Sequence, residues 1–132
     1  MDAIAKTIWL IESSLERDVT LDEIARAAGM SRFHLTRAFG RSLGRSVMHY
    51  MRARRLSEAA KRLAIGAPDI LSVALDAGYG SHEAFTRAFR DEFGVTPTEF
   101  RDRPNLAQYK LLEPIHMTNQ PNVKLAEPRI ID

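Results

Sequence analysis

Two stretches of this 132-residue chain contain the same run of four residues, Thr-Arg-Ala-Phe, which begins at Thr36 and again at Thr86. In both stretches apolar residues recur at helical spacing, so the polar residues between them must face away from the buried side. Arginine donates hydrogen bonds to guanine, glutamate accepts from the cytosine amino group, and threonine or phenylalanine contacts the thymine methyl group. We therefore expect base contacts from Arg32, Phe33, Thr36 and Arg37 in the first stretch, and from His82, Glu83, Thr86 and Arg87 in the second.

Positive charge is concentrated in the central part of the chain. Residues 32–62 carry nine Lys or Arg and one acidic residue, a local charge of +8, whereas the whole chain carries +2. A solvated helix surface would also look like this, but the pattern favours an anionic partner such as a nucleic acid. At least one of Arg52, Arg54 and Arg55 is expected to pack structurally, because they interrupt an apolar stripe. Phosphate contacts are expected from Ser31, Arg41, Arg52, Arg55, Arg90 and Thr96.

The sequence lacks the residues that other kinds of functional site would need. Cysteine is absent, which excludes disulfides, thiolate nucleophiles and cysteine-bound metals. No nucleophile, base and orienting group occur together, so we expect no enzyme, cofactor or metal site. The longest apolar run, residues 8–11, is too short to cross a membrane. Asp2 and Lys6 stand where a signal peptide would be apolar, so we expect a cytoplasmic protein without a membrane partner.

Helical spacing runs through almost the whole chain up to residue 103. Thr20 and Thr96 each precede a glutamate by three residues, which is the reciprocal capping-box pattern that begins a helix. Glycines and Pro68 mark helix ends. The predicted fold is all-α with about seven helices, over residues 4–15, 21–28, 32–43, 47–65, 70–77, 82–93 and from 97 onward.

The chain also contains an internal repeat with an offset of 49 to 50 residues. Ala25 and Gly29 of the first copy return as Ala74 and Gly78. A small alanine allows two helices to cross closely, and glycine supplies the positive φ of the turn between them. The pattern predicts two helix-turn-helix subdomains, residues 1–45 and 69–103, joined by a long central helix over 46–66 into one domain, 1–103.

Several motifs of the repeats and of the connecting helix occur together: Leu21-x-x-Ile24-Ala25-x-x-Ala28-Gly29-Met30-Ser31, Tyr50-x-x-x-Arg54-x-x-x-Glu58-Ala59-Ala60, Val73-Ala74-x-x-Ala77-Gly78-Tyr79-x-Ser81 and Phe93-Gly94-Val95-Thr96-Pro97. With these motifs the chain resembles, over residues 3–103, the DNA-binding region of AraC/XylS-type transcription regulators, most closely the MarA/SoxS/Rob-like group. Gly40 departs from the resemblance, because the family more often has a basic residue there, and this puts one phosphate contact in doubt.

The resemblance implies a transcription regulator whose two recognition helices enter adjacent major-groove segments of double-stranded DNA. The connecting helix would be roughly 28 Å long at ~1.5 Å per residue, close to the ~34 Å of one turn of DNA. Because the two units differ in their outward residues, we expect an asymmetric site bound by a monomer. RNA polymerase is a further expected partner if the protein is an activator. The alternative is an all-α adaptor that binds an acidic protein partner through its basic helix.

The C-terminal tail, residues 104–132, differs from the rest of the chain. It contains four prolines at a spacing that a long helix would not tolerate, and residues 123–127 alternate like a strand. The tail resembles the lead into a GyrI-like effector-binding domain, through which a small-molecule effector would act. We expect a linker that DNA binding does not need. The alternative is that its apolar residues pack back onto the helices: Leu106, Tyr109, Leu111 and Leu112.

Overall fold

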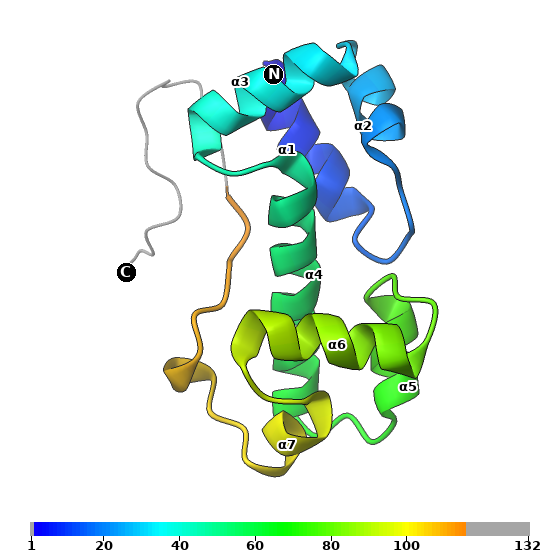
Figure 1. Cartoon of the computed structure of the whole chain (residues 1–132), viewed down its shortest axis with the longest axis vertical. Helices are drawn as coiled ribbons and strands as arrows, with labels where there is room; N and C mark the ends of the chain where they lie inside the picture. Colours follow the sequence, from blue (N-terminus) through cyan, green and yellow to red (C-terminus); the bar gives the residue numbers. More distant parts are fainter. Residues whose placement is uncertain (1, 116–132) are drawn as a thin grey trace. The chain divides into compact units, whose positions relative to one another are not determined.

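The computed structural model describes residues 2–115, which form an all-helical fold without strands in that range (Figure 1). Seven α-helices and one short 3₁₀ helix follow one another along this part of the chain: α1 (Ala3–Ser13), α2 (Leu21–Ala28), α3 (Arg32–Leu43), α4 (Val47–Ala64), α5 (Ile70–Asp76), α6 (His82–Phe93), α7 (Pro97–Asp102) and η1 (Leu106–Gln108). The predicted all-α class is confirmed.

Helix starts are set by the capping residues that the sequence predicts. Thr20 and Thr96 each accept a hydrogen bond from the backbone N–H of a glutamate three residues on, and that glutamate accepts one in return. The hydroxyls of Ser31, Ser46 and Ser81 cap α3, α4 and α6 in the same way, each from the residue just before the helix. Local side-chain chemistry therefore decides where these helices begin.

The described residues form two compact units. The first comprises residues 2–14, 19–50 and 113–115, and the second comprises Leu15–Asp18 and Met51–Leu112. The helix α4 contributes its first residues, Val47 to Tyr50, to the first unit and the remainder to the second.

The first unit packs α1, α2 and α3 against one another, and α3 also contacts the start of α4. Its core contains the fully buried side chains of Ile11, Leu35 and Phe39. The Phe39 ring meets the Tyr50 ring edge-on, with the two centroids 5.8 Å apart. Trp9 of α1 is 58% exposed, although large apolar side chains are more often buried.

The second unit has a core rich in aromatic rings. Phe85 and Phe89 of α6 and Phe100 of α7 are buried together with apolar residues of α4 and α5. The Phe89 ring lies 4.8 Å from that of Phe93 and 5.8 Å from that of Phe100, centroid to centroid, in edge-on arrangements. Such pairs add stability beyond the area they bury.

Part of the tail packs on this second core. Tyr109 and Leu111 lie partly buried against it, whereas Leu106 stays exposed. The structure thus favours packing, the alternative that the sequence left open, for residues 109–111. The strand expected over residues 123–127 lies outside the described residues. Within residues 2–115, no helix combines the length and apolar character that a membrane crossing requires.

Candidate nucleic-acid interface

Both predicted recognition helices follow a glycine turn and expose the side chains that the sequence assigns to base contacts, except for Thr86, which is partly buried. On α3, Leu35 and Phe39 are buried, while Arg32, Phe33, Thr36 and Arg37 are exposed. Phe33 is 74% exposed, which is unusual for a large apolar side chain. The turn glycine, Gly29, has φ of 75°, as expected. The capped helix therefore presents polar, cationic and aromatic groups to solvent.

Arg32 at the start of α3 has two neighbours that restrict it. Its guanidinium lies 3.6 Å from the Asp22 carboxylate on α2 and 5.8 Å from the centroid of the Phe33 ring. Because both charged groups of the ion pair are more than half exposed, the pair contributes little to stability. The guanidinium thus lies near both the Asp22 carboxylate and the Phe33 ring at the N-terminal end of α3.

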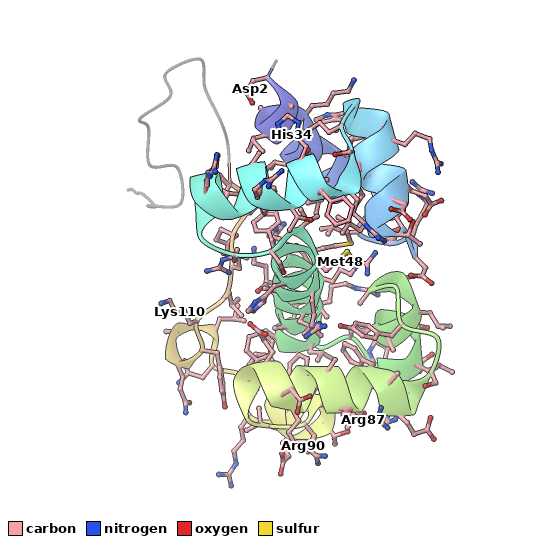
Figure 2. The ribbon with its side chains drawn as sticks, turned by 45° about the horizontal axis from the view of Figure 1, so that its top comes forward. Asp2, His34, Met48, Arg87, Arg90 and Lys110 are labelled. Carbon is pink, nitrogen blue, oxygen red and sulfur yellow. The ribbon has the colours of Figure 1, made fainter. Side chains whose placement is uncertain are left out.

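The helix α6 presents the second set of predicted base-contacting residues. His82, Glu83 and Arg87 are exposed, and Thr86 is partly buried. The Thr86 hydroxyl lies 3.4 Å from Nδ1 of His82, one helical turn earlier. Arg87 and Arg90 lie on this helix, both exposed to solvent (Figure 2). Each unit therefore brings its own four predicted residues onto one helix.

The residues expected to contact phosphate fall into three groups. Arg41, Arg52 and Arg90 are exposed. Ser31 and Thr96 are the N-caps of α3 and α7, and their hydroxyl groups already accept backbone hydrogen bonds. The last one, Arg55, is engaged within the second unit.

Arg55 binds backbone carbonyls through its guanidinium. Nε donates to the carbonyl of Leu15 at 3.0 Å, and Nη2 donates to that of Arg17. Burial lowers the pKa of Arg55 below its usual value, against the opposing effects of Tyr79 and Asp18, but an arginine remains charged at neutral pH. These contacts give Arg55 a structural role, in place of the phosphate contact that we expected from it.

Arg55 also lies against the turn before α6. A Cβ added to Gly78 would stand 3.2 Å from Cζ of Arg55, and Gly78 has φ of 88°. The turn therefore requires glycine for two reasons, its positive φ and the close approach of the guanidinium.

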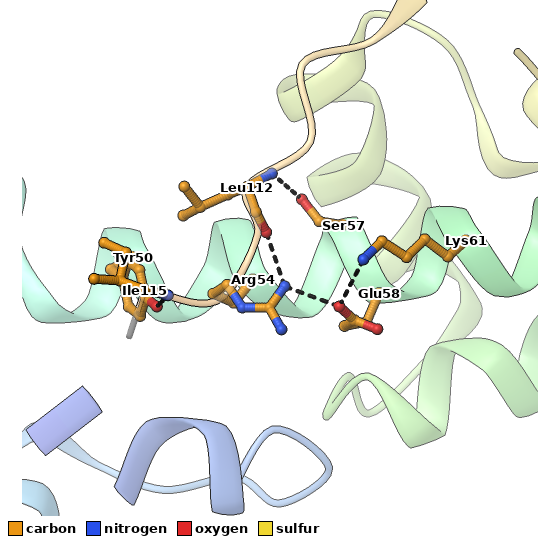
Figure 3. A network of polar contacts seen from close by, with 7 residues as sticks. All are labelled: Tyr50, Arg54, Ser57, Glu58, Lys61, Leu112 and Ile115. Carbon is orange, nitrogen blue, oxygen red and sulfur yellow. Dashed lines mark hydrogen bonds and ion pairs between the residues drawn. The ribbon is translucent and has the colours of Figure 1, made fainter. Parts of the chain in front are cut away.

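Arg54, like Arg55, packs structurally, so two of the three arginines meet the expectation that at least one would. Its side chain is 2% exposed, and Nη1 donates to Glu58 Oε2 at 3.0 Å and to the carbonyl of Leu112 at 2.8 Å (Figure 3). Burial alone would raise the pKa of Glu58, but the hydrogen bond and charge of Arg54, together with Lys61, hold it below its usual value. Arg54 follows the buried Tyr50 by four residues, about one helical turn, but this spacing alone does not assign a partner to the guanidinium.

Residues 2–115 hold no cluster of three or more His, Asp or Glu side chains arranged to bind a metal ion.

Comparisons with known proteins agree with this arrangement. A family model described as "Helix-turn-helix domain" matches residues 24–103. The chain is 42% identical to a probable transcription factor, PqrA, from Proteus vulgaris, over 71% of this chain and 78% of that protein. It is 38% identical to the right origin-binding protein of Escherichia coli K12 over 83% of this chain, but it spans only 38% of that protein's length.

Several solved structures have the same fold as this chain. An AraC-type regulator from Chromobacterium violaceum has a TM-score of 0.69 at 29% identity, covering 78% of this chain and 95% of that one. The DNA-binding domain of AdpA, solved with a target DNA, has a TM-score of 0.72 at 25% identity, covering 77% and 92%. With its two capped helix-turn-helix units and these relatives, the chain belongs to the AraC-type family of helix-turn-helix transcription regulators.

Proposed function

We propose that this chain binds double-stranded DNA sequence-specifically and regulates transcription, with α3 and α6 as its recognition helices. The observation that carries the proposal is that each helix buries an apolar stripe, follows a glycine turn and exposes base-contacting residue types. The solved complex of the AdpA domain with a target DNA supports it, because that domain shares this fold.

The structure supports most of the residue assignments that the sequence makes. Base edges are contacted by Arg32, Phe33, Thr36 and Arg37 on α3 and by His82, Glu83, Thr86 and Arg87 on α6, all of them exposed except the partly buried Thr86. Exposed Arg41, Arg52 and Arg90 contact phosphates. The helix N-termini at Ser31 and Thr96 offer backbone N–H groups to phosphate. We leave Arg55 out of the phosphate set, because its guanidinium donates to two carbonyls.

The finer features of the function follow from the difference between the two helices. With unlike residues on α3 and α6, the preferred DNA site is asymmetric and is bound by a monomer in the cytoplasm. RNA polymerase is a further partner if the protein is an activator, and a small-molecule effector would act only through a separate effector-binding domain, which residues 2–115 do not form. The chain has no enzymatic role in this proposal.

Selection of bound sequences from a random pool of duplexes is the first test of this function. We expect one asymmetric site to be enriched. The absence of any enriched sequence would favour the adaptor alternative, in which the basic helix binds an acidic protein.

A salt titration then checks the binding mode. With the roughly five phosphate contacts that remain in the set, the slope of log affinity against log salt concentration should be about −4.5. A slope near zero in a fluorescence titration with the random duplex would contradict the electrostatic part of the proposal.

A further inference from the structure

Residues 109–112, which we call the strap, pack on the second unit although they lie beyond both predicted helix-turn-helix units. The family match ends at residue 103. Tyr109 and Leu111 nevertheless lie against the core that α4, α5, α6 and α7 form. Contacts of this kind are those of a structural element, because a solvated linker would bury no such side chains.

One end of the strap contacts the recognition helix α6 through aromatic rings. The Tyr109 ring lies 6.1 Å from that of Phe93 and 5.3 Å from that of Phe100, centroid to centroid, at interplanar angles of 74° and 67°. Phe93 is the last residue of α6 and Phe100 belongs to α7. Tyr109 therefore packs at the C-terminal end of α6, where it contacts both helices.

The other end of the strap is held by α4 through both backbone groups of one residue. The Leu112 N–H donates to Ser57 Oγ at 2.8 Å, and Arg54 Nη1 donates to the Leu112 carbonyl at 2.8 Å (Figure 3). Ser57 and Arg54 are 1% and 2% exposed and Leu112 is partly buried, so both bonds are largely shielded from water on the α4 side. Loss of a buried hydrogen bond is costly, and two such bonds on one residue determine the register of the strap on α4.

These contacts connect the strap to the helix that carries the predicted base contacts. We propose that residues 109–112 are a positioning element: they hold the C-terminal end of α6 against α4 and so orient its exposed side chains toward DNA. Strap docking and specific DNA binding then stabilise each other, since each favours the same orientation of α6. This inference rests on the proposed function.

Substitutions in the full chain test the proposal against the duplex that the unmodified chain selects and a random duplex of equal length. Tyr109→Ala should weaken binding to the selected duplex about tenfold. Binding to the random duplex should change less than about twofold, because phosphate contacts supply it. In the Tyr109→Ala variant, the protein should also no longer protect the half of the DNA site whose base preference Arg87→Ala relaxes. Tyr109→Phe keeps the ring, and Leu106→Ala alters an exposed residue of the same tail, so both controls should bind like the unmodified chain.

A folded Tyr109→Ala variant, checked by circular dichroism, that binds the selected duplex as tightly as the unmodified chain overturns the proposal. An equal loss of affinity for both duplexes also overturns it, because that loss reflects general destabilisation.

Hydrogen exchange of the unmodified chain provides a second readout that needs no variant. Addition of the selected duplex should slow exchange of the Leu112 amide about tenfold. Unchanged exchange overturns the proposal even where Tyr109→Ala does not fold. If no duplex is enriched from the random pool, the proposed function itself fails, and that outcome is distinct from failure of the strap.

Discussion

In the first helix-turn-helix unit, a Cβ added to the turn glycine, Gly29, would meet nothing within 4 Å. At the equivalent Gly78 of the second unit, the Arg55 guanidinium occupies that space, with Cζ 3.2 Å away. Both glycines have positive φ. The first unit therefore needs glycine in its turn only for the positive φ. The second unit needs it both for the positive φ and because the Arg55 guanidinium lies so close.

The two units also differ in how far apart in sequence the recognition helix and the residues that pack against it lie. Leu35 and Phe39 of α3 pack in a unit that residues 2–14 and 19–50 mostly supply. The helix α6 depends on α4, on α7 and on Tyr109. A repeated motif can therefore be supported locally in one copy and by distant segments in the other, which makes the second unit more sensitive to remote changes.

Among the changes that test this difference between the units, removal of the tail should have the largest effect on stability. A chain stopped at Arg103 loses the partly buried side chains of Tyr109, Leu111 and Leu112, so its stability should fall by about 2–4 kcal/mol. The thermal midpoint should drop by about 10 °C relative to a chain stopped at Ile115, which keeps these side chains. An unchanged midpoint for the shorter chain would support the linker interpretation of the tail.

Replacing each turn glycine by alanine separates the cost of a positive φ from the cost of the close approach of Arg55. Gly29→Ala should cost about 1 kcal/mol, because only the positive φ is strained. Gly78→Ala should cost about 2–3 kcal/mol, because Arg55 must also move. Denaturant unfolding measures both values. In an Arg55→Ala background the excess cost at Gly78 should vanish, and equal costs at both glycines in the unmodified background would refute the steric argument.

Removal of one arginine from each recognition helix tests whether the two units read DNA separately. Arg37→Ala and Arg87→Ala should each weaken specific binding by about 1–3 kcal/mol and relax base preference in one half of the site only. Selection from a random duplex pool with each variant shows which half changes. Equal losses with specific and random duplexes would instead identify both residues as phosphate contacts.

The smallest expected effect concerns the interior of the two recognition helices. Gly40 of α3 is equivalent to Arg90 of α6, and a Cβ at Gly40 would meet nothing within 4 Å. Gly40→Ala should raise stability by about 0.5–1 kcal/mol, and Arg90→Gly should lower it by a similar amount. Chemical denaturation measures both changes. If Gly40→Ala lowered the stability instead, the open space around Gly40 would not explain the result, and this prediction would be wrong.

The sequence by itself determined the helical elements and the outward residues of α3 and α6. Thr20 with Glu23, and Thr96 with Glu99, begin their helices through hydrogen bonds that span three residues. Helical periodicity likewise assigned Leu35 and Phe85 to the core. These features were predictable because the interactions that produce them lie within one or two helical turns.

Only the tertiary structure decided the roles of residues whose partners lie far away in sequence. Arg52, Arg54 and Arg55 look alike in the sequence, yet Arg54 binds Leu112, Arg55 binds Leu15, and Arg52 is exposed. Tyr109 likewise stands in a proline-rich tail and still packs on Phe93 and Phe100. Their partners are brought together by the packing of whole helices, and no local pattern encodes which distant carbonyl or ring an arginine or tyrosine will meet.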